Sequence, residues 1–423
     1  MKKPVRKVLD NGMRIVVVPM PGSPTVTTVA FVEAGSKYET KEINGISHFL
    51  EHMFFKGTEK RKKSIDISGE LDGIGALSNA FTGNEYTGYY AKARAKYFTR
   101  IADVISDMFL NSKFPKEEIE KERGVIMAEI DMYEDLPQFN VEEVLDNLMY
   151  GDQPAGWSIA GPKENIKKIS QEDFFEYRKK HYVAEKTAIV VAGDVNPKDV
   201  FKEIEKKFEN VSTSKGLKKL KVKESQTTKQ VLLKHKTTDQ THVAIGFRSF
   251  KVGHKDNVKI KVLADVLGGS MSARLFQRLR EEMGVAYYVR SSNNSQSDVG
   301  VFSIKTGVDS KRIDEVLNAL GEEILKLKNE LVEEKELKKS KEHMIGMLGM
   351  ALEASDDVAM WVGSKEILHQ ELITPDILIK EIQKVTAKDI QKMAQTIFQE
   401  KGMNLAIIGP HKDGKELLKH LKV

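Results

Sequence analysis

The sequence predicts an α+β protein built from two duplicated domains of similar topology, each an antiparallel-rich sheet packed with helices. The first observation is length: the chain has 423 residues, whereas one domain usually takes roughly 100 to 200 residues. The second is that both halves contain short strand-like runs beside longer runs of helical period, without a regular strand–helix alternation. The third is a helix–strand pattern that closes the first half and recurs at the end of the chain.

The first half opens as a sheet that leads into a helix. The expected strands are residues 5–9, 13–18 and 26–32. Asn11-Gly12 separates the first two, and Asn-Gly between β-rich runs is the strongest short hairpin signal. Apolar residues between 46 and 53 recur at helical spacing, which predicts a helix that Gly57 is placed to end.

Caps and prolines mark the other elements of the first half. Ser64 and Ser170 are placed to cap helices. Pro115 stands where a first-turn proline belongs, so it opens a long helix over residues 116–133. The remaining expected elements are strands at 76–82, 86–93 and 187–192 and a helix at 97–110.

An offset of 216 residues (409 − 193) aligns the end of the first half with the end of the chain. It places Gly193 on Gly409, and the apolar run 189–191 on 405–407, without a gap. A cap, a helix, an apolar strand and a glycine in one register predict duplication of a unit of about 200 residues. The alternative is chance similarity of two helix–strand units. The other aligned pairs are Ser170 with Thr386, Asp173 with Asp389 and Tyr182 with Phe398.

We therefore expect an N-terminal domain at residues 1–215, a linker at 216–230 and a C-terminal domain at 231–423. The stretch 210–230 is rich in Ser, Thr and Lys and shows little apolar periodicity, as exposed linkers do. The expected elements of the C-terminal domain are strands at 231–233 and 241–247 and helices at 257–267, 309–329 and 332–350.

Composition excludes several classes of protein. The sequence has no cysteine, so disulfides and thiolate metal sites are excluded, and a zinc ion must be held by His, Asp or Glu. The net charge of +5 is spread along the chain, which argues against nucleic-acid binding; the basic run 60–63 is expected to be a solvated loop. No signal peptide or membrane span is visible, so we expect a cytoplasmic protein.

The segment His48-Phe49-Leu50-Glu51-His52 is the strongest candidate site. On a helix His48 and His52 share one face, with Glu51 beside them, and the order H-x-x-E-H is the inverzincin zinc signature. A catalytic zinc generally has three protein ligands. Glu122 and Glu129 lie seven apart on one face of the helix after Pro115, and spacing alone leaves the choice between them open. Two histidines on one helix also occur in ordinary packing.

These segments, together with the longer string HFLEHMFFKGT at 48–58, resemble the pitrilysin and insulinase family of zinc metallopeptidases. They are similar in particular to its short members, such as the catalytic subunit of the mitochondrial processing peptidase and its bacterial relatives. In that family the third ligand lies 77 residues after the second histidine, and 129 − 52 = 77. The resemblance therefore implies that Glu129 is the ligand and that Glu122 helps to orient the site.

The resemblance covers both halves and implies two further sets of site residues. Asn79, Ala80 and Phe81 match an edge strand whose backbone pairs with an extended substrate. Arg280 and Tyr287 match a pair that contacts the substrate near the zinc, and both side chains can donate to a polarised carbonyl. The second domain thus lacks the metal motif and carries the Arg/Tyr pair.

The function that this resemblance implies is a zinc-dependent endopeptidase, with one Zn2+ per chain, acting on extended peptides or unfolded segments inside a dimeric chamber. Glu51 would activate a zinc-bound water. Longer relatives join two such duplicated units into a clamshell, so this chain corresponds to half of one. A homodimer is the simpler expectation, and a heterodimer with a paralogous subunit is the alternative.

Two other functions stand against the peptidase. A non-catalytic assembly or substrate-holding subunit would have lost ligands, whereas every ligand position is filled here. A zinc hydrolase of small molecules would leave the expected edge strand unexplained.

Overall fold

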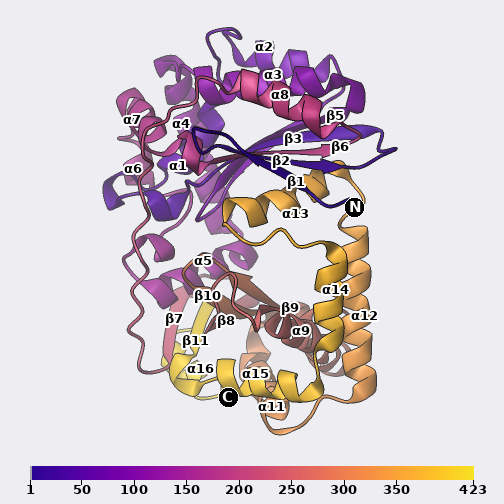
Figure 1. Ribbon diagram of the computed structural model, residues 1–423. Helices are drawn as coiled ribbons and strands as arrows, with labels where there is room; N and C mark the ends of the chain where they lie inside the picture. The colour runs from indigo at the N-terminus through magenta and orange to yellow at the C-terminus, as the bar shows by residue number, and fades with distance from the viewer. Residues whose placement is uncertain (1) are drawn as a thin grey trace. The chain divides into compact units, whose positions relative to one another are not determined.

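Two mixed sheets form the framework of the protein in the computed structural model, which describes residues 2–423 (Figure 1). Each sheet belongs to one of two compact units. Unit 1 contains the chain up to Asp131 together with Ser158–Leu220 and Gly349–Pro375, and unit 2 contains Met132–Trp157, Lys221–Leu348 and Asp376–Val423. The chain passes from unit 1 to unit 2 after Asp131, after Leu220 and after Pro375, and the second of these crossings lies inside the expected linker.

The sheet of unit 1 has six strands with one parallel pairing. Their spatial order is β1 (Val5–Val8), β2 (Arg14–Pro19), β6 (Thr187–Gly193), β3 (Thr25–Val32), β5 (Thr87–Arg94) and β4 (Leu77–Thr82). The pairing of β2 with β6 is parallel, and the others are antiparallel. β4 lies at the edge and pairs only with β5 among the described strands.

The sheet of unit 2 repeats this pattern with five strands. Their order is β7 (Gln230–His235), β11 (Asn404–Gly409), β8 (Gln240–Ser249), β10 (Gly300–Asp309) and β9 (Ala286–Ser295). The pairing of β7 with β11 is parallel, and the remaining pairings are antiparallel. Removing β1 from the first sheet leaves the same topology, so β9 is the counterpart of β4.

The helix caps repeat as well. Ser170 and Thr386 each accept a hydrogen bond from the backbone N–H of an aspartate three residues later, and that aspartate accepts one in return from the cap. This reciprocal arrangement satisfies donors that a helix start leaves free. The predicted α+β class, with two units of similar topology, is therefore confirmed.

Helices cover the sheet of unit 1 on both faces. One face carries a core that includes Phe49 and Leu50 of the first helix, Ile101 and Ile105, and Phe174. The helices of this unit are α1 (Ile46–Met53), α2 (Ser64–Asp72), α3 (Phe98–Asn111), α4 (Lys116–Asp135, of which the last four residues fall in unit 2), α6 (Lys163–Ile166), α7 (Gln171–His181), α8 (Pro197–Lys207) and α13 (Ser355–Ile367). Short 3-10 turns lie at Ser36–Tyr38, Lys41–Ile43, Ala95–Tyr97 and Ala184–Lys186.

Unit 2 is built in the same way. Its core packs one face of the sheet against helices through residues such as Leu263, Leu317 and Ile390. The helices are α5 (Pro137–Tyr150), α9 (Asn257–Gly268), α10 (Arg274–Phe276) with a π-helical continuation at Gln277–Glu282, α11 (Ile313–Asn329), α12 (Glu334–Met350), α14 (Pro375–Lys384), α15 (Ala387–Ile397) and α16 (Gly414–Leu418). Short 3-10 turns lie at Pro154–Gly156, Ser310–Arg312 and Glu400–Gly402. None of the described helices has the length and apolar character that a membrane crossing requires.

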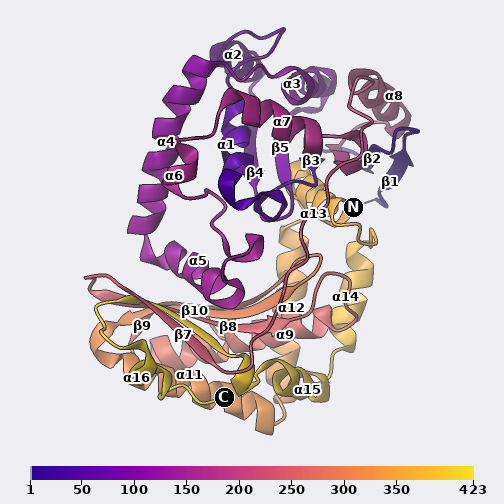
Figure 2. The same cartoon turned by 90° about the vertical axis from the view of Figure 1, so that its left-hand side faces the viewer.

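The two units exchange one helix each relative to a sequential division of the chain. Helix α5 comes from the first half but packs on the second face of the unit 2 sheet, where Leu145 meets Ala244 and Ala406 (Figure 2). Helix α13 comes from the second half and packs through Val358 and Val362 on the unit 1 sheet (Figure 1). The compact units therefore depart from the division at 1–215 and 231–423. The reason is that both faces of each sheet are apolar and must be covered.

Candidate functional site

The zinc-motif helix α1 begins at Gly45, which has a φ of 102°. A side chain could not fit there, because a Cβ would lie 2.5 Å from the carbonyl oxygen of Ala160. The buried carboxylate of Glu39 accepts hydrogen bonds from the N–H groups of Gly45 and Ser47, both at 2.8 Å, and so caps the helix. Burial raises the pKa of Glu39 to about 7, although these donors oppose the rise. The start of α1 is thus set by tertiary contacts.

His48, His52 and Glu129 converge at one point, as predicted. Their candidate ligand atoms all lie within 4.8 Å of one another, and they form the one such cluster of three among residues 2–423. The carboxylate Oε2 of Glu129 lies 3.7 Å from Nε2 of His48 and 3.6 Å from Nε2 of His52. Two ligands held about 2.0 to 2.2 Å from a tetrahedral zinc lie roughly 3.3 to 3.6 Å apart. The three groups therefore fit a zinc ion.

The state of His48 also suits a metal ligand. Burial, with a smaller contribution from the nearby His52, lowers the pKa of His48 to about 4, so its imidazole is neutral at pH 7. A metal ligand must be the neutral ring. The buried Nδ1 atom of His48 has no hydrogen-bond partner in the described chain.

Glu122 lies behind His52 and fixes its ring. The Nδ1–H of His52 donates to Oε1 of Glu122 at 2.8 Å, which leaves Nε2 facing Glu129. Burial is the largest single influence and opposes the charge on both groups, but their hydrogen bond together with the neighbouring opposite charges outweighs it: the pKa of His52 is raised and that of Glu122 is lowered. The other carboxylate oxygen of Glu122 forms an ion pair with Lys56. Such partners of a metal-ligating histidine set its tautomer and direction.

Glu51 lies on the same helix and contacts the edge strand. Its Oε2 accepts a hydrogen bond of 2.5 Å from the hydroxyl of Thr82, the last residue of β4. Burial raises the pKa of Glu51, and the hydrogen bond from Thr82 and the charge of His52 oppose that rise. A carboxylate with a raised pKa beside a candidate metal site is suited to taking up and returning a proton.

The predicted substrate-binding residues Asn79, Ala80 and Phe81 lie on β4 at the free edge of the sheet. The backbone N–H of Ala80 donates to Oδ1 of Asn79 at 2.9 Å and so points away from β5. The ring of Phe81 packs against Phe31 with a centroid distance of 5.9 Å. Because residues alternate along an antiparallel strand, the backbone of Phe81 faces β5, and its side chain belongs to the core.

Arg280 and Tyr287 come together within unit 2. Nη1 of Arg280 donates to the backbone carbonyl of Tyr287 at 3.2 Å. Arg280 lies on the π-helical segment Gln277–Glu282. Tyr287 is the extra residue of a β-bulge, because Gly307 pairs with Tyr288 and the next residue pairs with Ala286. π-Helices and bulges are frequent at functional sites, where they redirect side chains.

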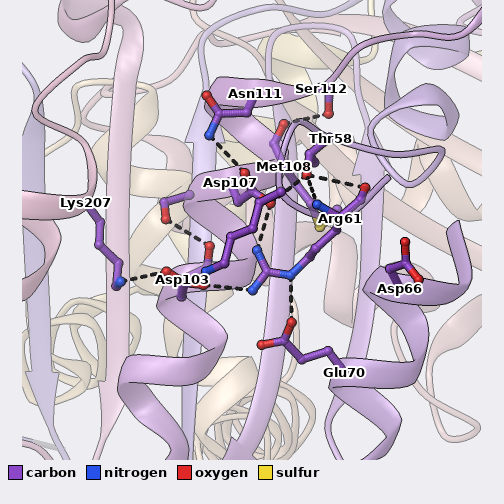
Figure 3. A network of polar contacts seen from close by, with 12 residues as sticks. Thr58, Arg61, Asp66, Glu70, Asp103, Asp107, Met108, Asn111, Ser112 and Lys207 are labelled. Atoms are coloured by element: carbon purple, nitrogen blue, oxygen red, sulfur yellow. Dashed lines mark hydrogen bonds and ion pairs between the residues drawn. The ribbon is translucent and has the colours of Figure 1, made fainter. Parts of the chain in front are cut away.

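A charged network holds the loop that follows α1 (Figure 3). Arg61 is only 3% exposed and donates to Asp107 at 2.7 Å, to Asp103 at 2.7 Å and to Glu70 at 2.8 Å. Thr58 also donates to Asp107, at 2.7 Å. The prediction that residues 60–63 form a solvated loop is therefore wrong for Arg61, because three carboxylates compensate its buried charge.

Two residues that contact the site were not singled out from the sequence. Lys56 lies four residues after His52, one helical turn away, so spacing could have pointed to it. Thr82 ends the edge strand, and its position beside Glu51 depends on how that strand packs against α1. No sequence pattern carries this second relationship.

Comparison with known proteins agrees with this geometry. The model of the insulinase family (peptidase family M16) matches residues 14–163, and that of the peptidase M16 inactive domain matches residues 168–344. The first match contains all three candidate metal ligands, His48, His52 and Glu129. Two solved structures share the fold: a protease from Helicobacter pylori, with a TM-score of 0.90 at 23% identity over 96% of this chain and 99% of the other, and a peptidase M16 inactive domain from Pseudomonas fluorescens, with a TM-score of 0.89 at 16% identity over 97% and 98%.

Curated relatives match over nearly the full length of the chain. YmxG of Bacillus subtilis (strain 168), named an uncharacterized zinc protease, is 37% identical over 408 residues, which cover 96% of this chain and 98% of the relative. SCO5738 of Streptomyces coelicolor, with the same description, is 30% identical over 414 residues, or 96% and 90%. A protein of Rickettsia bellii, also named an uncharacterized zinc protease, is 32% identical over 408 residues, or 95% and 97%. This chain belongs to the insulinase family, peptidase family M16.

Proposed function

We propose that this chain is a zinc-dependent endopeptidase that cleaves extended peptides or unfolded segments. The observation that carries the proposal is the convergence of His48, His52 and Glu129, with Glu51 on the same helix and next to a free strand edge. The names of the curated relatives, which call them zinc proteases, support it.

His48, His52 and Glu129 would hold the zinc. When bound there, zinc supplies a Lewis acid that polarises the scissile carbonyl and acidifies a water. Glu51 accepts the proton of the attacking water and returns it to the leaving amine nitrogen. Glu122 keeps the ring of His52 in the ligating orientation throughout.

The edge of β4 would hold the substrate as an added strand. In an antiparallel pair only alternate residues bond to their neighbour, and Ala80 belongs to the outward set because its N–H bonds to the Asn79 side chain. A peptide that pairs there gains backbone hydrogen bonds without regard to its sequence. This favours extended chains over folded ones as substrates.

Arg280 and Tyr287 would complete the site from a second copy of the chain. Both lie in irregular backbone, and Tyr287 is 59% exposed, so each can turn toward a ligand. Their donors would stabilise the oxyanion of the tetrahedral intermediate. We propose a homodimer with two such shared sites; a heterodimer with a paralogous chain would use the same residues.

The proposal is tested with purified protein and an unstructured peptide library. We expect one zinc per chain and cleavage that a chelator abolishes and added zinc restores. Glu51→Gln should keep the zinc and lose roughly 10²- to 10⁴-fold in kcat, whereas Glu117→Gln on the exposed side of α4 should change neither. Protein that binds no zinc and cleaves nothing would instead be a non-catalytic subunit, and turnover by Glu51→Gln at the wild-type rate would contradict the role of Glu51.

A further inference from the structure

We propose that the Thr82 hydroxyl is a positioning group for Glu51, so that the strand that receives the substrate also holds the base in place. The inference rests on the proposed peptidase function and adds a residue to it. It starts from one contact, the 2.5 Å hydrogen bond from Oγ1 of Thr82 to Oε2 of Glu51.

The pleat of β4 places Thr82 on the correct face of the sheet. Side chains alternate along a strand, so Thr82 and Ala80 share one face and Phe81 takes the other. Ala80 packs against the core that contains α1, and Phe81 packs against the core on the α13 side. The Thr82 hydroxyl therefore points to the helix that carries Glu51.

The hairpin that ends β4 is itself anchored. The N–H of Gly83 donates to the carbonyl of Tyr86 at 2.9 Å, which closes the turn. Within the turn, Glu85 forms ion pairs with the buried Lys37 at 3.4 Å and with Lys219 at 2.6 Å. The anchored turn thus holds Thr82 in place, and the hydrogen bond from Thr82 orients the Glu51 carboxylate.

The consequence for Glu51 follows from the shape of a carboxylate. When Oε2 is occupied by Thr82, Oε1 is the oxygen left to accept and return the proton. Threonine suits this task because its β-branch restricts χ1. The outward backbone of β4 would also pair with the peptide. The same strand would therefore position both the substrate and the base. Loss of the hydroxyl should therefore lower kcat more than it raises KM.

The experiment compares Thr82→Val, which keeps the shape but removes the hydroxyl, with Thr82→Ser, which keeps the hydroxyl. Thr87→Val is the matched control, because Thr87 pairs directly with Thr82 and its hydroxyl donates to the carbonyl of Ala34 at 2.9 Å, away from Glu51. We expect Thr82→Val to lose roughly 10- to 100-fold in kcat with the zinc content and KM within about two-fold. Thr82→Ser should recover most of the rate, and Thr87→Val should lower Tm without this loss.

A second measurement does not depend on turnover. In zinc-free protein the Tm changes of Thr82→Val and Glu51→Met should be non-additive, because each variant removes one partner of the same hydrogen bond. The positioning role is overturned if kcat of Thr82→Val stays within about two-fold of wild type, if the loss lies in KM alone, or if the Tm changes add. Glu51→Gln separates the two proposals: its retained turnover contradicts the peptidase mechanism, whereas an inactive Glu51→Gln beside a fully active Thr82→Val contradicts only the role of Thr82.

Discussion

Arg280 donates a hydrogen bond to the backbone carbonyl of Tyr287, seven residues further along the chain, at 3.2 Å. Tyr287 is the unpaired residue of a β-bulge, so its carbonyl lacks the usual strand partner and Arg280 supplies the donor. The two residues predicted to act together on a substrate thus already share one local structure. The guanidinium also lies over the ring of Phe276, with its carbon 5.0 Å from the centroid.

The proposed shared site predicts complementation between two inactive variants. His48→Ala removes a zinc ligand, and Arg280→Ala removes a donor that the other chain would supply. In a mixed dimer one of the two sites regains a full set, so mixing the variants should restore part of the peptidase activity. Arg278→Ala, on the same π-helical segment, should stay active alone. Confirmed mixed dimers that remain inactive would contradict a site shared between chains.

Lys56 is predicted to affect the affinity for zinc through Glu122. Lys56→Met leaves the buried Glu122 carboxylate without its cation, and the support of His52 weakens. We expect the zinc affinity to fall by roughly 10- to 100-fold, measured by competition with a chromogenic chelator. Lys56→Arg should retain most of the affinity, and Lys62→Met, at an exposed position, should leave it unchanged. Equal zinc affinities for all three variants would contradict a role of Lys56 in supporting His52 through Glu122.

Arg61 is predicted to matter for folding. Arg61→Met leaves Asp103, Asp107 and Glu70 facing one another without their shared cation, and a broken buried ion pair costs about 3 to 5 kcal/mol. Urea unfolding should show that loss in the free energy of unfolding. Lys60→Met removes an ion pair from a side chain that is 60% exposed, so it should cost only about 0 to 1 kcal/mol. Equal losses for the two variants would show that the network contributes no more than surface charge.

Glu39 predicts a pH dependence of stability. Its pKa is about 7 in the folded protein against about 4.5 for an unperturbed group, so the folded chain binds its proton more readily. The stability that this proton contributes is fully present below pH of about 4.5 and is lost as the pH rises to about 7. Unfolding of zinc-free protein between pH 4.5 and 8 should therefore show wild type losing stability relative to Glu39→Gln. A constant difference between the two proteins would contradict the raised pKa.

Much of the fold follows from local signals in the sequence. The Asn11-Gly12 turn joins β1 and β2 as predicted, and the capping boxes at Ser170 and Thr386 both form. Ser64 is an exception, because it is the first helical residue and Lys63 precedes it as the cap. Local sequence preference predicts the ends of an element to within a residue or two, and packing decides the exact terminal residue.

The sequence does not predict that α5 packs on the sheet of unit 2 and α13 on the sheet of unit 1. Both helices carry a stripe of apolar residues. Such a stripe predicts that one face of the helix is buried, but it does not predict which sheet covers that face. Which sheet a helix joins depends on contacts such as Leu145 against Ala244, which are far apart in the chain.

By itself the sequence predicted most elements of the first half, the duplication and the shared helix face of His48 and His52, because helical and strand periods are properties of neighbouring residues. It did not predict the strands β9 and β10 or the helices α5, α8 and α13. It left the choice between Glu122 and Glu129 open until a family resemblance was used. Only the tertiary structure placed Glu129 within 3.7 Å of both histidines, Glu122 behind His52 and Thr82 beside Glu51. These relationships join separate elements, so they depend on how helices and strands pack, and packing distances are not encoded in any local pattern of residues.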